Sequence, residues 1–129
     1  MEMNAGGAKL VLVVDDDEPI QEFMKIVIER EGFQTMIASN GAVGLEIAKA
    51  YKPSLILTDI MMPQMDGYQM IRKLQEDGET RGIPVMIISS KQMDQSTKDM
   101  LKMEPNVKDF VEKPVKPSAL SAQIHAHLG

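Results

Sequence analysis

The feature that most constrains the fold is a strict alternation of short apolar runs with segments of helical character. The run at 10–14 reads Leu-Val-Leu-Val-Val and is bounded by charged residues, which is typical of a strand buried on both faces of a sheet. The segment that follows begins near Pro19, ends near Gly32, and carries one apolar stripe at helical spacing, formed by Ile20, Phe23, Met24, Val27 and Ile28.

The same alternation continues to the end of the chain. Further strands are predicted at 33–38, 54–58, 85–88 and 108–111. Helices are predicted at 41–51, after a cap at Asp66, after a cap at Asp94, and at 116–128. Five strands alternating with five helices predict an α/β fold, in which a parallel sheet with right-handed crossovers carries helices on both faces.

The length of 129 residues fits one domain. We expect a flexible N-terminal segment at 1–8 and a single folded unit over 9–129. The longest uninterrupted aliphatic run, 10–14, is far shorter than the roughly 20 residues that cross a bilayer, and the first residues lack a signal pattern. We therefore expect a protein without membrane association.

Charge and cysteine content exclude several classes of function. The formal net charge of −5 disfavours direct nucleic-acid binding, which depends on clustered Lys and Arg. The chain has no cysteine, so it has no disulfide scaffold, thiolate metal site or cysteine nucleophile. A reducing, cytoplasmic location is the simplest interpretation.

Polar residues stand where the predicted strands end, and ligands of open parallel sheets bind beyond the carboxyl ends of the strands. These residues are Asp15, Asp16 and Asp17 after the first strand, Asp59 after the third, Ser89 and Ser90 after the fourth, and Lys113 after the fifth. Carboxylates within about 5 Å of each other repel by roughly 3 kcal/mol per pair at an effective dielectric near 20, so such a cluster calls for a cation. Oxygen ligands suit hard ions, and a shallow, partly hydrated site fits Mg²⁺ better than an all-protein calcium cage. Zinc is disfavoured because the chain lacks Cys and suitably placed His.

A carboxylate beside a divalent ion and a lysine can accept a phosphoryl group. The metal and the ammonium group offset charge on the transferring oxygens, and a hydroxyl on the fourth strand can donate a hydrogen bond to them. A carboxylate is already ionised at neutral pH, so no histidine base is required.

Four sequence blocks, in this order, resemble the signature of the response-regulator receiver family. They are Val-Val-Asp-Asp-Asp-Glu at 13–18, Leu-Thr-Asp-Ile-Met-Met-Pro at 57–63, Met-Asp-Gly at 65–67 and Glu-Lys-Pro at 112–114. The resemblance spans about residues 9–128, and the family includes regulators of chemotaxis. It implies a flavodoxin-like, doubly wound sheet of strand order 2-1-3-4-5 and phosphorylation by a sensor histidine kinase or phosphotransfer protein.

The resemblance also implies a role for each site residue. The Mg²⁺ ligands would be Asp16, Asp59, the backbone carbonyl of Met61, and Asp15, which binds directly or through water. The phosphoryl group on Asp59 would be contacted by the cation of Lys113 and by the switch hydroxyl of Ser89, with Phe110 turning inward behind that hydroxyl. Family members usually have a cis bond before the proline that corresponds to Pro114.

The implied protein is a regulatory domain rather than an enzyme. Its downstream effector would bind the face formed by the fourth helix, fifth strand and fifth helix, and the chain would be a monomer or a phosphorylation-dependent dimer. The sequence departs from the family pattern at Met61 and Lys91, where members often carry other side chains that tune the loss of the phosphoryl group. Segment 101–107 also lacks the usual glycine-containing turn before the fifth strand.

Two other functions remain open from the sequence. A haloacid-dehalogenase-like phosphatase also uses an aspartate nucleophile and often begins with a strand and an Asp-x-Asp motif, here Asp15 and Asp17. A receiver-like interaction module that is never phosphorylated is the second. His125 and His127 lie two positions apart on a predicted helix and face different directions, so we expect solvated side chains and no metal pair.

Overall fold

The computed structural model describes residues 8–60, 66–90 and 93–129. Its strands are β1 (Leu10–Val14), β2 (Gln34–Ala38), β3 (Leu55–Asp59), β4 (Val85–Ser89) and β5 (Val107–Glu112). Its helices are α1 (Glu18–Arg30), α2 (Gly41–Tyr51), α3 (Gly67–Gln75), α4 (Gln95–Lys102) and α5 (Pro117–Leu128). The predicted flexible segment at 1–8 lies outside the described residues except for Ala8.

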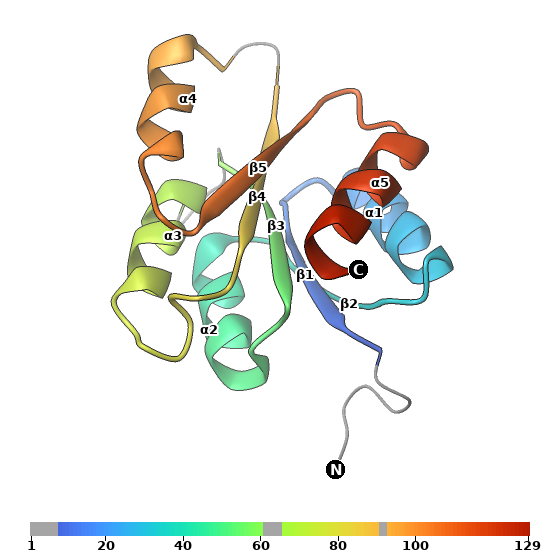
Figure 1. Ribbon diagram of the computed structural model, residues 1–129, viewed down its shortest axis with the longest axis horizontal. Coiled ribbons are helices and arrows are strands. Elements are labelled where there is room, and N and C mark those ends of the chain that lie inside the picture. Colours follow the sequence, from blue (N-terminus) through green and yellow to red (C-terminus); the bar gives the residue numbers. More distant parts are fainter. Residues whose placement is uncertain (1–7, 61–65, 91–92) are drawn as a thin grey trace.

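The five strands form one parallel sheet in the order β2-β1-β3-β4-β5, which confirms the predicted fold. Helices α1 and α5 cover one face of the sheet, and α2, α3 and α4 cover the other (Figure 1). Because all strands run in the same direction, their carboxyl ends meet at one edge of the sheet. The residues after β1, β3, β4 and β5 are therefore brought together there.

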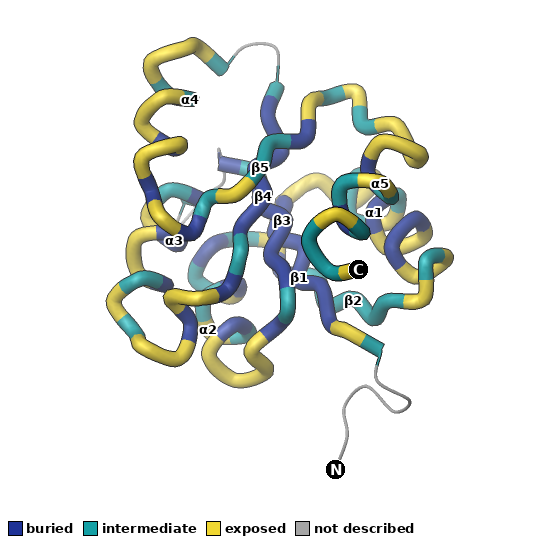
Figure 2. Tube along the Cα trace, viewed as in Figure 1, coloured by how far each residue is buried: buried dark blue, intermediate teal, exposed yellow. Residues whose placement is uncertain are grey.

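The core has two layers, one on each face of the sheet. Along β1 the side chains alternate between them: Val11 and Val13 pack with α1 and α5, whereas Leu12 and Val14 pack with α2, α3 and α4. Every residue of β1 is buried, which explains why its sequence is continuously apolar. Figure 2 shows the buried central strands β1, β3 and β4 between helices whose outer surfaces are exposed.

Both predicted aspartate caps are present. The carboxylate of Asp66 accepts a hydrogen bond from the backbone N–H of Gln69 at 2.8 Å, and that of Asp94 accepts one from Thr97 at 2.8 Å. Each cap satisfies a backbone donor that would otherwise lack a partner in the first helical turn. Across the described ranges, no helix combines the length and apolar character that crossing a membrane requires.

Strands β3 and β4 each end one residue later than the sequence predicted, and β3 also begins one residue later, at Leu55. Asp59 and Ser89 are the last residues of these strands because parallel pairing continues at Asp59↔Ile88 and Ser89↔Glu112. The two polar side chains are therefore held by the sheet itself rather than by a loop.

Segment 101–107, which lacks the glycine-containing turn common in the family, forms a buried network of polar contacts with α3 just before β5. Glu104 is only 6% exposed, and its carboxylate accepts hydrogen bonds from Tyr68 at 3.3 Å, Arg72 at 3.2 Å and Gln75 at 2.6 Å. Gln75 also donates to the side-chain oxygen of Asn106 at 2.9 Å. A carboxylate and an amide replace the flexibility of glycine with fixed contacts.

The two histidines of α5 were predicted to be solvated, but each lies beside an acidic side chain. His125 Nε2 lies 2.8 Å from a carboxylate oxygen of Glu31, the residue after α1, and His127 Nε2 lies 3.2 Å from one of Asp109 in β5. The side chains do face different directions, as predicted, and each finds an acidic partner on a different element. The prediction was wrong because the position of α5 against α1 and β5 is a tertiary feature.

Candidate functional site

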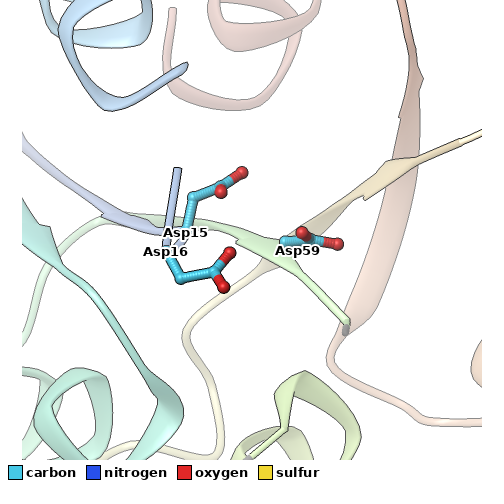
Figure 3. A group of neighbouring side chains, drawn as sticks. All are labelled: Asp15, Asp16 and Asp59. Atoms are coloured by element: carbon cyan, nitrogen blue, oxygen red, sulfur yellow. The ribbon is translucent and has the colours of Figure 1, made fainter. Parts of the chain in front are cut away.

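Three carboxylates meet at the carboxyl ends of β1 and β3. Asp15 and Asp16 directly follow β1, and Asp59 ends β3, the neighbouring strand, in which Thr58 pairs with Val14. One oxygen from each carboxylate can be chosen so that all three lie within 4.8 Å of one another (Figure 3). This spacing matches the 5 Å cluster expected from the sequence.

Asp15 is the buried member of this cluster. Its residue is 0% exposed, and its Oδ1 accepts the backbone N–H of Asp17 at 2.9 Å. Its Oδ2 is buried and has no hydrogen-bond partner among the described residues. Burial raises the pKa of Asp15 from its ordinary value of 3.8 to about 6, against the lowering effects of the Asp17 N–H and Lys113, and the negative charges of Asp59 and Asp16 add to the rise.

The cluster has the chemistry of a site for a hard divalent cation. All donors are carboxylate oxygens, and the buried Oδ2 of Asp15 lacks the partner that a cation would supply. Asp16 is exposed, so the site opens to solvent and suits an ion that keeps several waters. Met61, predicted to add its backbone carbonyl, lies outside the described residues.

The backbone around Asp59 is fixed by a close approach of α3. Oδ1 of Asp59 accepts the backbone N–H of Ile60 at 2.7 Å. The N–H of Gly67, the first residue of α3, donates to the carbonyl of Ile60 at 2.9 Å. A Cβ at Gly67 would collide with the carbonyl oxygen of Asp59 and lie 3.0 Å from Cα of Ile60, so only glycine fits here.

Ser89 and Lys113 lie next to each other at the same edge. The backbone N–H of Lys113 donates to the carbonyl of Ser89 at 2.9 Å. Ser89 is 1% exposed, and its Oγ has no hydrogen-bond partner among the described residues. The bond between Lys113 and Pro114 is cis, as the family resemblance implied.

Phe110 lies on β5, three residues before Lys113. It is half-buried and packs against the hydrophobic layer on the α2, α3 and α4 face of the sheet. The ammonium group of Lys102 in α4 lies 5.9 Å from the centroid of its ring, and Gln123 in α5 donates to its carbonyl at 2.9 Å. The ring thus lies between α4 and β5, on the face predicted for output.

Sequence reasoning missed one residue that contacts the site. The amide nitrogen of Gln21 in α1 donates to the carbonyl oxygen of Asp15 at 2.6 Å and to Ser39 Oγ at 3.2 Å. Helical periodicity placed Gln21 on α1 but gave no signal for its partners, because Ser39 belongs to a different strand–helix connection. Apart from Met61, every predicted site residue lies in the described part of the chain.

The chain matches the model of a known protein family and is similar in sequence to several named proteins. The model of the response regulator receiver domain family matches residues 11–125. Protein PilH of Pseudomonas aeruginosa is 36% identical over 118 residues, which cover 92% of this chain and 96% of PilH. The DNA-binding response regulator MtrA of Mycolicibacterium smegmatis is 36% identical over 119 residues, which cover 92% of this chain but only 50% of MtrA.

Solved structures show the same fold. The signal receiver domain of a histidine kinase from Syntrophus aciditrophicus has a TM-score of 0.83 at 30% identity, covering 94% of this chain and 90% of that domain. The receiver domain of a sensor histidine kinase from Pseudomonas aeruginosa has a TM-score of 0.85 at 20% identity, covering 95% and 99% of the two chains. In that second structure a magnesium ion is coordinated in the active-site cleft.

Proposed function

The chain belongs to the response regulator receiver domain family of two-component signalling, and we propose that Asp59 is its phosphoryl acceptor. The observation that carries this proposal is the carboxylate cluster itself. Asp59 shares it with Asp15 and Asp16, within 4.8 Å, at the sheet edge that also holds Ser89 and Lys113. The acceptor, the cation-binding groups and the groups that can bind phosphoryl oxygens are therefore together.

The donor would be a phosphohistidine on a sensor histidine kinase or phosphotransfer protein. In the transfer, the bond between phosphorus and the imidazole nitrogen breaks, and a bond forms between phosphorus and a carboxylate oxygen of Asp59. Asp15, Asp16, Asp59 and the backbone carbonyl of Met61 would hold Mg²⁺. When bound, the ion supplies positive charge beside the transferring oxygens.

Ser89 and Lys113 would bind the phosphoryl group and so stabilise the phosphorylated conformation. The buried Ser89 hydroxyl can donate to a phosphoryl oxygen, and the ammonium group of Lys113 can pair with another. Hydrogen bonds to charged groups contribute roughly 1.5–3 kcal/mol each, and a switch from 1:99 to 99:1 needs about 5.5 kcal/mol. Two such contacts are of the required size, and inward burial of Phe110 would add to them.

The output of this regulatory domain would be a contact through α4, β5 and α5. Met100 in α4 and Met103, the C-cap of that helix, are 42% and 81% exposed and would add apolar surface for a partner that contacts α4. DNA binding is a property of MtrA, of which this chain matches half. For this chain we propose a protein partner, without direct contact to nucleic acid or membrane, and a cytoplasmic unit that spans 9–129. It would act as a monomer or as a phosphorylation-dependent dimer.

The phosphatase alternative is not favoured. It requires Asp17 beside Asp15, but Asp17 is exposed, precedes the first turn of α1, and is not part of the group of carboxylates within 4.8 Å. The family match also opposes it. A receiver-like module that is never phosphorylated would retain the fold but fail the following test.

The test is incubation with acetyl phosphate and Mg²⁺, followed by intact mass measurement. We expect an increment of one phosphoryl group on the wild type, none on Asp59→Ala, and none when EDTA replaces Mg²⁺. Asp99→Ala, an exposed aspartate on α4, is the matched control and should be modified like the wild type. A wild type that gains no mass, or an Asp59→Ala variant that does, would refute the proposal.

A further inference from the structure

Gln21 connects three parts of the chain at the metal-binding edge. It belongs to α1, and its amide nitrogen donates both to the carbonyl of Asp15, 2.6 Å away, and to Ser39 Oγ, 3.2 Å away. Ser39 directly follows β2. The amide nitrogen carries two hydrogens, so the side chain can use both of its donors at once.

The carbonyl that Gln21 binds belongs to the peptide group between Asp15 and Asp16, two of the three residues in the carboxylate cluster. The N–H of Asp15 already donates to the carbonyl of Ala38 at 3.0 Å, which continues the pairing of β1 with β2. With Gln21 on the carbonyl, the backbone of Asp15 is held on both sides. The orientation of the following peptide, which carries Asp16, is then fixed as well.

This matters because Asp15 and Asp16 are held in different ways. Asp15 is buried, and its Oδ1 is bound by the N–H of Asp17 at 2.9 Å. Asp16 is exposed, so its direction depends on its backbone rather than on packing. A residue that fixes the Asp15–Asp16 peptide therefore determines where the second carboxylate points.

We propose that Gln21 is a positioning residue that orients the Asp15 and Asp16 carboxylates for Mg²⁺. This inference rests on the proposed function, because it takes the cluster to be the Mg²⁺ site. Gln21 would not itself be a ligand of the ion, because its amide nitrogen is a donor that already binds the Asp15 carbonyl and Ser39 Oγ. It acts as the hydrogen-bonding partners behind metal ligands do, and loss of such partners typically weakens metal affinity 10- to 100-fold.

The experiment compares Mg²⁺ affinity, by calorimetric titration, in the wild type, Gln21→Leu and Gln34→Leu. Leucine keeps the approximate size of glutamine and removes both donors. Gln34 starts β2 at the opposite end of the sheet, so Gln34→Leu makes the same chemical change away from the site. We expect Gln21→Leu to bind Mg²⁺ about tenfold more weakly, with Gln34→Leu unchanged.

A second measurement separates positioning from general stability. In the metal-free protein, the backbone amide resonances of Asp16 and Asp17 should shift in Gln21→Leu and stay in place in Gln34→Leu. The free energy of unfolding from urea titration shows whether both variants are folded. If Gln21→Leu does not fold, Gln21→Ala, which removes the same donors without adding apolar bulk, replaces it, and we expect the same roughly tenfold weaker Mg²⁺ binding.

Each outcome decides the proposal. A folded Gln21→Leu protein that binds Mg²⁺ as the wild type does would overturn it and leave the phosphoacceptor role of Asp59 intact. If Gln21→Ala is the variant used, unchanged affinity overturns the proposal in the same way. A wild type that binds no Mg²⁺ overturns the positioning role of Gln21 and also the proposed metal site, a result that the mass measurement with acetyl phosphate detects independently.

Discussion

Replacing Asp15 by asparagine should make the metal-free protein more stable while removing its response to Mg²⁺. Asparagine retains the side-chain oxygen that accepts the N–H of Asp17, so the local turn is preserved. It replaces the buried Oδ2, which has no partner among the described residues, with an amide that can donate to neighbouring carboxylates. The change therefore removes a charge from a place where the folded protein holds it at a cost.

The size of this cost follows from the pKa of Asp15. Burial is the main cause that raises the pKa from 3.8 to about 6. A difference of about two pH units corresponds to about 3 kcal/mol, at 1.36 kcal/mol per unit. The cluster opens to solvent at the exposed Asp16, so screening by solvent reduces the electrostatic cost of the Asp15 charge. We therefore expect Asp15→Asn to raise the free energy of unfolding by about 2 kcal/mol near pH 7.

The gain should depend on pH with a defined sign. Between its ordinary pKa of 3.8 and about 6, Asp15 binds more protons in the folded state than in the unfolded state. The free energy of unfolding of the wild type therefore falls, relative to the variant, as pH rises through this range. The difference between the two proteins should be absent below pH 3.8 and complete above about pH 6.

Urea titrations followed by circular dichroism, in EDTA and again in Mg²⁺, measure both effects. Glu46→Gln removes one exposed negative charge on α2 and controls for the change in net charge. Mg²⁺ should stabilise the wild type and Glu46→Gln but not Asp15→Asn, because a ligand stabilises only the protein that binds it. Equal stability of Asp15→Asn and the wild type in EDTA near neutral pH, or a difference that does not vary with pH, would refute the electrostatic reasoning.

Three further predictions use the same urea assay. Gly67→Ala should lose more than about 2 kcal/mol of unfolding free energy, because its Cβ meets backbone atoms, while Gly78→Ala, with nothing within 4 Å, should lose none. The hydrogen bond to Glu31 raises the pKa of His125 above 6.5, so the stability that wild type holds over His125→Gln should be complete below pH 6.5 and fall as pH rises through the higher, folded-state pKa. Glu104→Gln should lower the free energy of unfolding by about 1–2 kcal/mol, because the buried side chain loses the hydrogen bonds of a charged carboxylate. An unchanged free energy of unfolding would refute a stabilising role for the Glu104 carboxylate.

The parallel α/β architecture was predictable from the alternation of apolar runs with helical segments, whereas the strand order was predicted from the family resemblance. Runs such as 10–14 and 85–88 are apolar on both faces, and strands of that kind occur in parallel sheets covered by helices. Small differences remained at the strand ends. Asp59 and Ser89 extend β3 and β4 because pairing with the neighbouring strand continues, which a single strand's sequence does not reveal.

The sequence by itself determined that Asp15, Asp16 and Asp59 would meet, because parallel strands bring their carboxyl ends to one edge. Only the tertiary structure decided that Asp15 is buried and Asp16 exposed, although they are neighbours in the chain. The reason is physical: periodicity specifies which direction a side chain takes from its own element, whereas burial and hydrogen-bond partners depend on how elements pack. The contacts of Gln21 with Asp15 and Ser39 arise from that packing.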